Sequence, residues 1–411
     1  MRTAPPRLLG AALVLVLAAL FAGCGKAGRG QSSGGGPTGS VAAVATSGAL
    51  AVATRNTTRL GGADAAADAA AVARAVYPGL TPATRPAAVV LVDEHDWSAA
   101  LAASALAGAP LGAPLLYSKG NTLPAVSRQT LEAMRPVGAP ALGGAQVIRV
   151  GTSAAVPGGY LTHSLAATEP AVAAGTLQRL LRRAAGGRAP HQVIVLAANA
   201  ERTLQMPAAG LAAESGAPIL FVTQARVPAA TAAVLASLGR PSIYVIDAAA
   251  VGTHTLGELR RFGPVTAIPG TSATVERADP VANSIAVARF TDGAFGWGIK
   301  EPGHGLVFAN AARPLDAPAG ALLSATGDYG PLLVLKAAGG IPPALAGYLG
   351  DIQPAYTSAP QFRPVRGVYN HGWLLGDERA ISALTQSEID SLLEISPRKP
   401  SSEEPSVSPV E

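Results

Sequence analysis

Apolar residues in this chain gather in short unbroken runs, each followed by a polar loop and an Ala-rich stretch. Three such runs occupy residues 89–92, 193–196 and 306–308. Unbroken apolar runs of this length predict strands that are buried on both faces, as in parallel sheets. The Ala-rich stretches, such as residues 98–107 and 207–215, are long enough to form the crossover helices that parallel strands require.

The same order of elements occurs three times along the chain. Each repeat has a buried strand, an Ala-rich helix, a proline turn, a second strand, another helix and a third strand. Strands that alternate with helices in this way predict an α/β fold with a parallel sheet in each repeat. We expect second strands at residues 115–117, 219–222 and 332–335, third strands at 147–150, 243–246 and 373–375, and opening Ala-rich helices at 62–77, 172–184 and 281–290.

The repeat predicts three modules of similar size. The prolines of the turns, Pro114, Pro218 and Pro331, lie 104 and 113 residues apart, which sets the length of a unit. We therefore expect a first module over residues 45–168, a second over 169–270 and a third over 271–395. Residues 396–411 are polar and rich in Pro and Ser, which is typical of a disordered tail.

The amino terminus has the pattern of an export signal. Arg2 and Arg7 precede an apolar stretch at 8–21 that is too short for a hydrocarbon core of about 30 Å. The small residues before Cys24 make this end resemble the lipobox of bacterial lipoproteins. We therefore predict a lipoprotein signal peptide over residues 1–23, a lipidated Cys24, and a flexible Gly/Ser tether over 24–44. An ordinary signal peptide with a chance cysteine is the alternative.

Composition narrows the classes of function. The chain of 411 residues is 49% hydrophobic, 4% aromatic and 14% charged, with a net charge of +5 that falls to +3 without Arg2 and Arg7. Its basic residues are scattered singly, which argues against a nucleic-acid-binding protein. A net charge of +3 is too small to bind a polyanion by overall electrostatic attraction. Such binding would have to depend on a few specific arginines and backbone amides.

The chain lacks the usual sequence signals of catalysis. A single Cys excludes an internal disulfide and a cysteine-based metal site, and the six His are dispersed. We find no nucleophile elbow, phosphate loop or dinucleotide fingerprint, and predict no enzyme, metal or cofactor. The densest polar cluster, residues 93–96, is interpreted as a solvated loop, with a metal or acid/base site as the alternative. In the Gly/aromatic stretch at 293–298 we expect a loop whose aromatic side chains pack over the core of the third module. The alternative is that these aromatic rings stack on a sugar.

Three recurring motifs resemble the cell wall-binding repeat 2 family of bacterial surface proteins. The opening is Leu60-Gly61-Gly62-Ala63-Asp64, and the last strand with its follow-on recurs at 147–156, 243–251 and 373–381. The strand motif reads GAPLL at 112–116, GAPIL at 216–220 and GPLL at 330–333. The resemblance implies three tandem Rossmann-like (flavodoxin-like) modules in a pseudo-threefold arrangement. The family's helix aspartate is matched only by Asp316, with Ser98 and Gln205 at the equivalent places, so the chain resembles a divergent member.

The resemblance also implies binding residues. The family's apolar strand is associated with polymer binding at the junctions between modules, although buried strand positions are the alternative. Ligands of open parallel sheets lie beyond the carboxyl ends of the strands, and Arg suits phosphate or carboxylate oxygens. The expected polymer-binding residues are Pro114, Leu115 and Leu116, Pro218, Ile219 and Leu220, Pro331, Leu332 and Leu333, with Arg202, Arg313 and Asp316. The loops after the first strands add Asp93, His95, Trp97, Asn199 and Asn310.

Together these patterns predict a non-catalytic surface lipoprotein that binds an anionic cell-wall polymer or a peptidoglycan-linked glycan. We expect it on the outer face of the cytoplasmic membrane, held there by its lipid and associated with the wall. The alternative is an exported lipoprotein that acts as a solute receptor or as a wall-glycan hydrolase. A receptor should have two lobes with a hinged cleft, whereas an enzyme should show convergent carboxylates or a triad.

Overall fold

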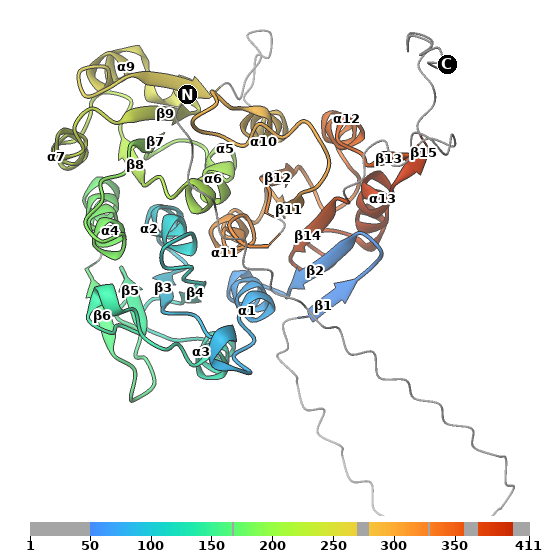
Figure 1. Ribbon diagram of the computed structural model, residues 1–411, viewed down its shortest axis with the longest axis horizontal. Helices are drawn as coiled ribbons and strands as arrows, with labels where there is room; N and C mark the ends of the chain where they lie inside the picture. Colours follow the sequence, from blue (N-terminus) through green and yellow to red (C-terminus); the bar gives the residue numbers. More distant parts are fainter. Residues whose placement is uncertain (1–49, 167, 269–278, 328, 357–368, 398–411) are drawn as a thin grey trace, which may run out of the picture. The chain divides into compact units, whose positions relative to one another are not determined.

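The three predicted repeats form three separate α/β sheets in the computed structural model (Figure 1). The structure describes residues 50–166, 168–268, 279–327, 329–356 and 369–397. All of them belong to the compact unit Ser47–Glu411. The predicted signal peptide, Cys24, the tether and most of the predicted tail lie outside the described residues.

The first sheet has four parallel strands in the order β4-β3-β5-β6. Its central strand is the unbroken run Val89–Val92, which is buried on both faces as predicted. Helices connect the first three strands along the chain and a loop leads to the fourth, so this sheet and its helices form the first module. Its elements are β3 (Val89–Asp93), α2 (Trp97–Ala103) with a 3-10 turn (Ser104–Ala107), β4 (Leu115–Ser118), α3 (Ala125–Met134), a 3-10 turn (Pro140–Leu142), β5 (Val147–Val150) and β6 (Thr162–Leu165).

The second sheet repeats this order as β8-β7-β9-β10, again with every strand parallel. Its central strand β7 is buried from Val193 to Ala197, because crossover helices cover both faces. The second module consists of β7 (Gln192–Ala197), α5 (Arg202–Gln205), α6 (Pro207–Ser215), β8 (Ile219–Val222), α7 (Ala229–Ser237), β9 (Ser242–Ile246), α8 (Ala248–Val251), α9 (Thr253–Leu259) and β10 (Val265–Ile268).

The third sheet has five strands in the order β1-β2-β14-β11-β12. A separate two-stranded sheet joins β13 (Ala355–Tyr356) to β15 (Ser396–Pro397), which takes up the first two residues of the predicted tail. The third module contains β11 (Gly305–Asn310), α11 (Asp316–Gly320), β12 (Leu332–Leu335), α12 (Pro343–Asp351), β14 (His371–Leu375) and α13 (Ala383–Leu393), with β1 (Leu50–Ala53) and β2 (Thr57–Gly61) from earlier in the chain. A further 3-10 turn (Pro82–Thr84) precedes β3 of the first module.

The amino-terminal strands complete the third sheet rather than the first. β2 pairs in parallel with β14, from Thr57 beside Gly372 to Leu60 beside Leu375, and β1 adds an antiparallel edge. We had placed this segment in the first module, and its sheet is instead that of the third. The reason is that each sheet takes a fourth strand from the segment just before the next opening helix. β6 and β10 supply it for the first two sheets, and only β2 is in position to supply it for the third.

Each opening helix lies between two modules. α1 (Ala65–Val76) contacts β4 and α3 of the first module and α11 of the third. α4 (Pro170–Ala184) contacts α2 of the first module and β8 of the second, and α10 (Pro280–Arg289) contacts α6 of the second and β12 of the third. Helices α2, α6 and α11 also contact one another in pairs, in the middle of Figure 1. The modules are thus joined pairwise, and their expected threefold symmetry stays a prediction.

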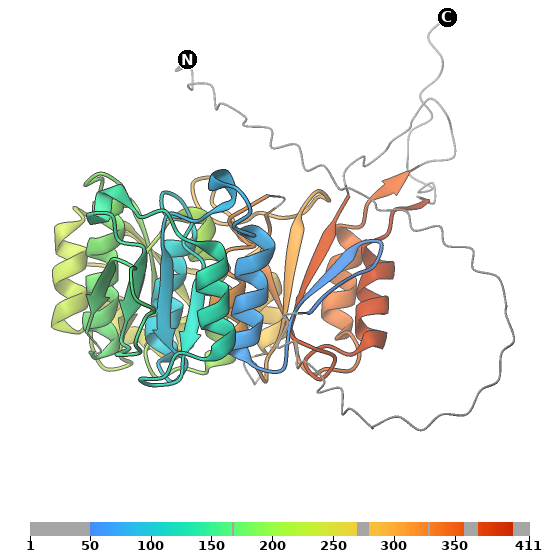
Figure 2. The same ribbon diagram turned by 90° about the horizontal axis from the view of Figure 1, so that it is seen from below.

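Small residues allow these modules to approach closely. A Cβ at Gly108 of the first module would lie 1.8 Å from the carbonyl oxygen of Ala213 on α6. A Cβ at Gly210 would lie 2.5 Å from Ser324 Oγ of the third module. Figure 2 shows the helices and strands running in nearly the same direction, so Ala- and Gly-rich faces meet along their length. This packing accounts for a hydrophobic chain with few aromatic residues.

The closing strand should make a measurable contribution to stability. Leu60 on β2 is 2% exposed and packs in the main core, whereas Val52 on β1 is 42% exposed. We expect Leu60→Ala to lower the free energy of unfolding by about 3 kcal/mol, because it leaves a cavity in the core. Val52→Ala should change it by less than about 0.5 kcal/mol. Urea unfolding followed by circular dichroism measures both values, and equal effects would contradict a closing role for β2.

Candidate functional site

In the polar loop after the first strand of the first module, the side chain of Asp93 forms hydrogen bonds with groups of the same module. Asp93 Oδ1 lies 2.8 Å from Nδ1 of His95 and accepts hydrogen bonds from the backbone N–H groups of Gly120 and His95. Burial opposes ionisation, but these hydrogen bonds prevail and lower the pKa of Asp93. Trp97 is buried, and its Nε1 donates to Gln205 Oε1 of the second module at 2.8 Å. This loop is therefore a structured turn beside a contact between modules.

The corresponding loop of the second module presents an exposed cation. Asn199 and Arg202 are both exposed beyond the carboxyl end of β7. Gln205, at the place of the family aspartate, is buried and donates to the carbonyl of Ala197 at 2.6 Å. The first two modules therefore use Trp97 and Gln205 to join each other, and Arg202 remains at the surface.

The corresponding loop of the third module is closed by an ionic cluster. Arg313 forms an ion pair with Asp68 of α1, and its Nε lies 3.2 Å from Asp316 Oδ2. Both aspartates are 0% exposed, and the Arg313 side chain is 19% exposed. Asn310 is also buried and donates to the carbonyl of Ala380 at 2.7 Å. In this arrangement Arg313 and Asp316 bind other parts of the chain.

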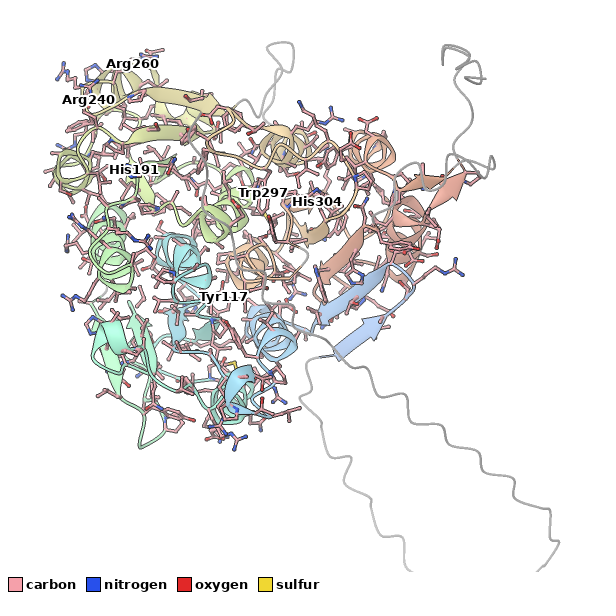
Figure 3. All side chains as sticks on the ribbon, viewed as in Figure 1. Tyr117, His191, Arg240, Arg260, Trp297 and His304 are labelled. Carbon is pink, nitrogen blue, oxygen red and sulfur yellow. The ribbon has the colours of Figure 1, made fainter. Side chains whose placement is uncertain are left out.

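Burial dominates the electrostatics of this cluster. It raises the pKa of Asp68 to about 6, against the lowering effects of a hydrogen bond with Asp316 and of the Arg313 charge. It raises the pKa of Asp316 still further, and the neighbouring Asp68 charge adds to the rise. The buried hydroxyl of Tyr117, labelled in Figure 3, donates to the carbonyl of Leu315 at 2.7 Å. These are convergent carboxylates, but they are sealed inside a contact between modules.

The nine predicted apolar binding residues all lie in the interior. They are the first two residues of β4, β8 and β12 and the prolines just before them, and the leucine and isoleucine side chains are 0–3% exposed. The three prolines are buried as well. The nine residues are Pro114, Leu115, Leu116, Pro218, Ile219, Leu220, Pro331, Leu332 and Leu333.

A cavity of about 520 Å³ lies next to one of these prolines, at the junction of the first and second modules. Its walls are the last turns of α4, the segment 188–192, the carboxyl end of α6 and the pair Ala109–Pro110 of the first module. Ala217 lines the cavity and directly precedes Pro218. The predicted junction between modules and the predicted strand motif therefore meet at one place.

The charged residues that line this junction cavity are all basic. Of the described residues, Arg182, Arg188 and His191 line it, and no Asp or Glu does. The Nε groups of Arg182 and Arg188 donate to the carbonyls of Gly187 and Ala185, at 2.9 and 3.4 Å. Within the described residues, the Nη groups of both arginines have neither a hydrogen bond nor an ion pair. The cavity thus offers several N–H donors and positive charge to a ligand.

The surface around the junction cavity is also basic. The second module has nine Arg and five acidic residues over 169–270, whereas the third has eight basic and twelve acidic residues over 271–395. His191, Arg240 and Arg260, labelled in Figure 3, are exposed on the second module. His191 and Arg240 stand just before β7 and β9, at the amino edge of the parallel sheet. This edge and the junction cavity together form what we call the basic edge.

A second cavity is less suited to an anion. It has a volume of about 590 Å³ and lies beside β2 and α13. Arg59 and Arg379 line it, but so do Asp377, Glu378 and Asp390. Three carboxylates would repel a polyanion, so charge favours the junction cavity.

Sequence reasoning missed the junction cavity. The sequence predicts a helix over residues 172–184 but does not indicate that Arg182 lines a cavity. The signal in the sequence was the accumulation of arginines over residues 179–188 just before a buried strand. The rule for parallel sheets pointed to the opposite, carboxyl edge.

Two further findings concern the described part of the chain. None of its helices combines the length and apolarity needed to cross a membrane. Within the same residues, no group of three His, Cys, Asp or Glu side chains is placed to hold a metal ion.

Comparisons with known proteins fit this architecture. The model of the Cell wall binding domain 2 (CWB2) family matches residues 59–158, from β2 to the loop after β5. The first module is thus similar to a cell wall binding domain 2 repeat. A search of curated proteins found no match to the chain. The second and third sheets repeat the strand order of this CWB2 module, which supports the prediction of three tandem repeats.

Two solved structures share the fold. Cwp6 from Clostridium difficile aligns over 82% of this chain and 48% of its own, with a TM-score of 0.60 and 15% identity. Cwp8 from Clostridium difficile aligns over 83% of this chain and 52% of its own, with a TM-score of 0.59 and 14% identity. The chain thus spans about half the length of each. At this identity the similarity concerns the fold, which extends over all three modules.

The two predicted arginines should differ sharply when they are replaced. Arg313→Gln leaves two buried carboxylates without their cation, so we expect it to lower the free energy of unfolding by about 3 kcal/mol at pH 7. The loss should be smaller at pH 5, where the carboxyls of raised pKa take up protons. Arg202→Gln, at an exposed position, should change it by less than about 0.5 kcal/mol. Thermal and urea unfolding at both pH values measure this, and equal effects of the two variants would contradict it.

Proposed function

We propose that this protein attaches without catalysis to an anionic polymer of the cell wall through the basic edge of its second module. The observation that carries the proposal is the junction cavity, where Arg182, Arg188 and His191 meet and no carboxylate is present. The CWB2 match of the first module and the fold shared with Cwp6 and Cwp8 support the wall as the location of the ligand.

The cavity's chemistry indicates the ligand class. Arginine Nη groups bind phosphate or carboxylate oxygens through paired hydrogen bonds, so a phosphodiester-linked glycan or a glycan with uronic acids fits. The volume of about 520 Å³ accommodates a charged sugar unit, and the exposed Arg240 and Arg260 can follow a longer chain. Since the contacts are ionic and partly exposed, binding should weaken as salt is added.

The buried strand motif has an indirect part in this proposal. Ile219 and Leu220 anchor β8 in the core, and this fixes the position of Ala217 and Pro218 at the cavity rim. Arg202 stays available to a polymer at the carboxyl edge, because it is exposed. Arg313 and Asp316 are omitted from the binding surface, because each is engaged by the buried cluster.

Two observations bear on the alternative functions. The carboxylates of Asp68 and Asp316 come together beside Arg313, but both are 0% exposed, which does not suit a hydrolase site. A solute receptor with two hinged lobes would differ from three modules that contact one another in pairs. A binding role without catalysis therefore agrees best with the geometry.

Removal of the two cavity arginines should abolish most of the wall binding. We expect Arg182→Gln with Arg188→Gln to weaken binding to purified walls by about tenfold or more at low salt, because each lost charge-assisted hydrogen bond contributes about 1.5 kcal/mol or more. Co-sedimentation of the full chain with walls of the bacterium that makes it, at increasing salt, measures the affinity. Walls stripped of their anionic polymers should retain little of the protein.

The matched control removes the same charge elsewhere. Arg74 and Arg128 are exposed on α1 and α3 and do not line the cavity. The double variant Arg74→Gln, Arg128→Gln should bind walls nearly as well as the unaltered chain. If both double variants lose affinity equally, bulk charge rather than the cavity binds the polymer. If the unaltered chain fails to bind intact walls, the proposed function is wrong.

We also propose that residues 1–23 direct export, that Cys24 then carries the lipid and that residues 24–44 tether the modules to the outer face of the cytoplasmic membrane. The pattern of charged, apolar and small residues before Cys24 supports this. Stable attachment usually needs a second contribution besides the acyl chains. Here the contact with the wall supplies it and keeps the modules close to the membrane.

Replacement of Cys24 should release the protein from the membrane. In cells fed a radiolabelled or alkyne-tagged fatty acid, the unaltered chain should incorporate label, and Cys24→Ala should not, because the chain contains no other Cys. The variant should then move from the membrane fraction to the wall or the medium. Labelling of the Cys24→Ala chain, or no labelling of the unaltered one, would contradict lipidation at this residue.

A further inference from the structure

A buried group of three ionisable side chains joins the first module to the third. It consists of Asp68 on α1 and of Arg313 and Asp316 at the start of α11. We propose that these three side chains form a proton-dependent clasp, which fastens the segment Thr57–Val76 to the third module and loosens when its shared proton is lost.

The clasp acts on the segment that closes the third sheet. Gly62 lies between β2 and α1, and its N–H donates to Asp68 Oδ1 at 2.6 Å. The carbonyl of Gly62 accepts from Arg313 Nη1 at 3.4 Å, and Arg313 also pairs with Asp68. A Cβ at Gly61 would lie 2.4 Å from Asp68 Oδ1, so the backbone and the carboxylate are in close contact. The position of Asp68 is thus tied directly to the pairing of β2 with β14.

The charges of the clasp do not balance when both aspartates are ionised. Two carboxylates that are 0% exposed then share the single cation of Arg313. Neither oxygen of Asp316 accepts a hydrogen bond from the described residues, which suits a protonated carboxyl that donates to Asp68. Like charges this close cannot both ionise at low cost, so one proton is retained.

Neighbouring charges do not supply the missing cation. Lys119 is engaged by two other carboxylates. Its Nζ lies 3.7 Å from Glu94 Oε1 and 3.8 Å from Asp64 Oδ2. Arg379 pairs with Asp377 at 2.7 Å, and Asp377 lies 3.7 Å from Arg313. From β4, the buried Tyr117 presents a hydroxyl that donates to Leu315. Arg59 of β2 is buried nearby, but its Nη1 donates to the carbonyls of Gly376 and Asp377, at 3.1 and 2.8 Å. Among the described residues, the cation that pairs with the clasp carboxylates is thus Arg313, and Asp377 adds a negative charge beside it.

The direction of the pH effect follows from proton linkage. In the opened segment Asp68 meets water and recovers an ordinary pKa, whereas burial in the closed form raises the pKa of Asp68 to about 6 and that of Asp316 further. The closed form therefore holds protons that the open form releases. Stability of the closure is greatest at acidic pH, falls as pH rises from about 4 through 6, and continues to fall as Asp316 ionises.

Hydrogen exchange of the full chain in detergent tests the clasp. Protection factors, corrected for intrinsic exchange rates, should fall about tenfold or more in β2 and α1 between pH 5 and pH 8. β7 and β8 of the second module should keep theirs. In Asp316→Asn the cluster is a simple Asp68–Arg313 pair, so this fall should disappear. Glu132→Gln, which removes an exposed ion pair with Arg128 on α3, should behave as the unaltered chain does.

Two results would overturn the clasp. One is an unchanged protection of β2 and α1 in the unaltered chain over this pH range, and the other is the same fall in Asp316→Asn. If the variant does not fold, carbon-13 titration of the aspartate carboxyls in the unaltered chain decides. A carboxyl that titrates above pH 6 and disappears from that range in Asp68→Asn supports the clasp, and ordinary titration of every aspartate near pH 4 contradicts it.

Discussion

The pairing of β2 with β14 is the contact on which the arrangement of the three modules depends. The sheet of each module takes a strand from the segment before an opening helix, and for the third sheet this strand is β2. The pairing therefore connects the beginning of the folded chain to its end. α1 follows β2 directly and packs between the first and third modules, so loss of this strand would also release the helix that joins them.

The contacts between modules differ in their chemistry although the modules share one strand order. The first and second modules meet through a neutral hydrogen bond from Trp97 to Gln205 beyond the carboxyl ends of the strands. At the opposite edge of the second sheet they border a cavity whose charged lining residues, among those described, are basic. The third and first meet through Asp68, Arg313 and Asp316, which are ionic and buried. A neutral junction leaves its surrounding arginines free to bind a ligand, whereas an ionic junction uses its arginine to hold the fold. Repetition of a module has thus produced one junction suited to binding and another suited to closure.

Burial decided the role of each residue that the strand motif and the loops had nominated. Leu115, Ile219 and Leu332 lie in strands covered on both faces, so they stabilise the core and position the turns before them. Arg202 and Arg313 occupy similar places in the repeat, yet one is exposed and the other pairs with a carboxylate from α1. The difference arises from Asp68, the fourth residue of α1, which α1 brings to the third module. The fourth residue of α10 is the neutral Asn283, which donates to the carbonyl of Leu204 in the second module.

The sequence alone determined the fold class, the threefold repeat, nearly every central strand and the family resemblance. These features depend on local patterns, namely unbroken apolar runs, Ala-rich helices and proline turns. The fourth strands could not be predicted from the sequence, because β6 and β10 are short and half-exposed and contain no unbroken apolar run. Only the tertiary structure decided that β2 closes the third sheet, that Arg313 is enclosed and that Arg182, Arg188 and His191 share a cavity. Each of these depends on segments that lie far apart in the chain and meet only when the modules pack together.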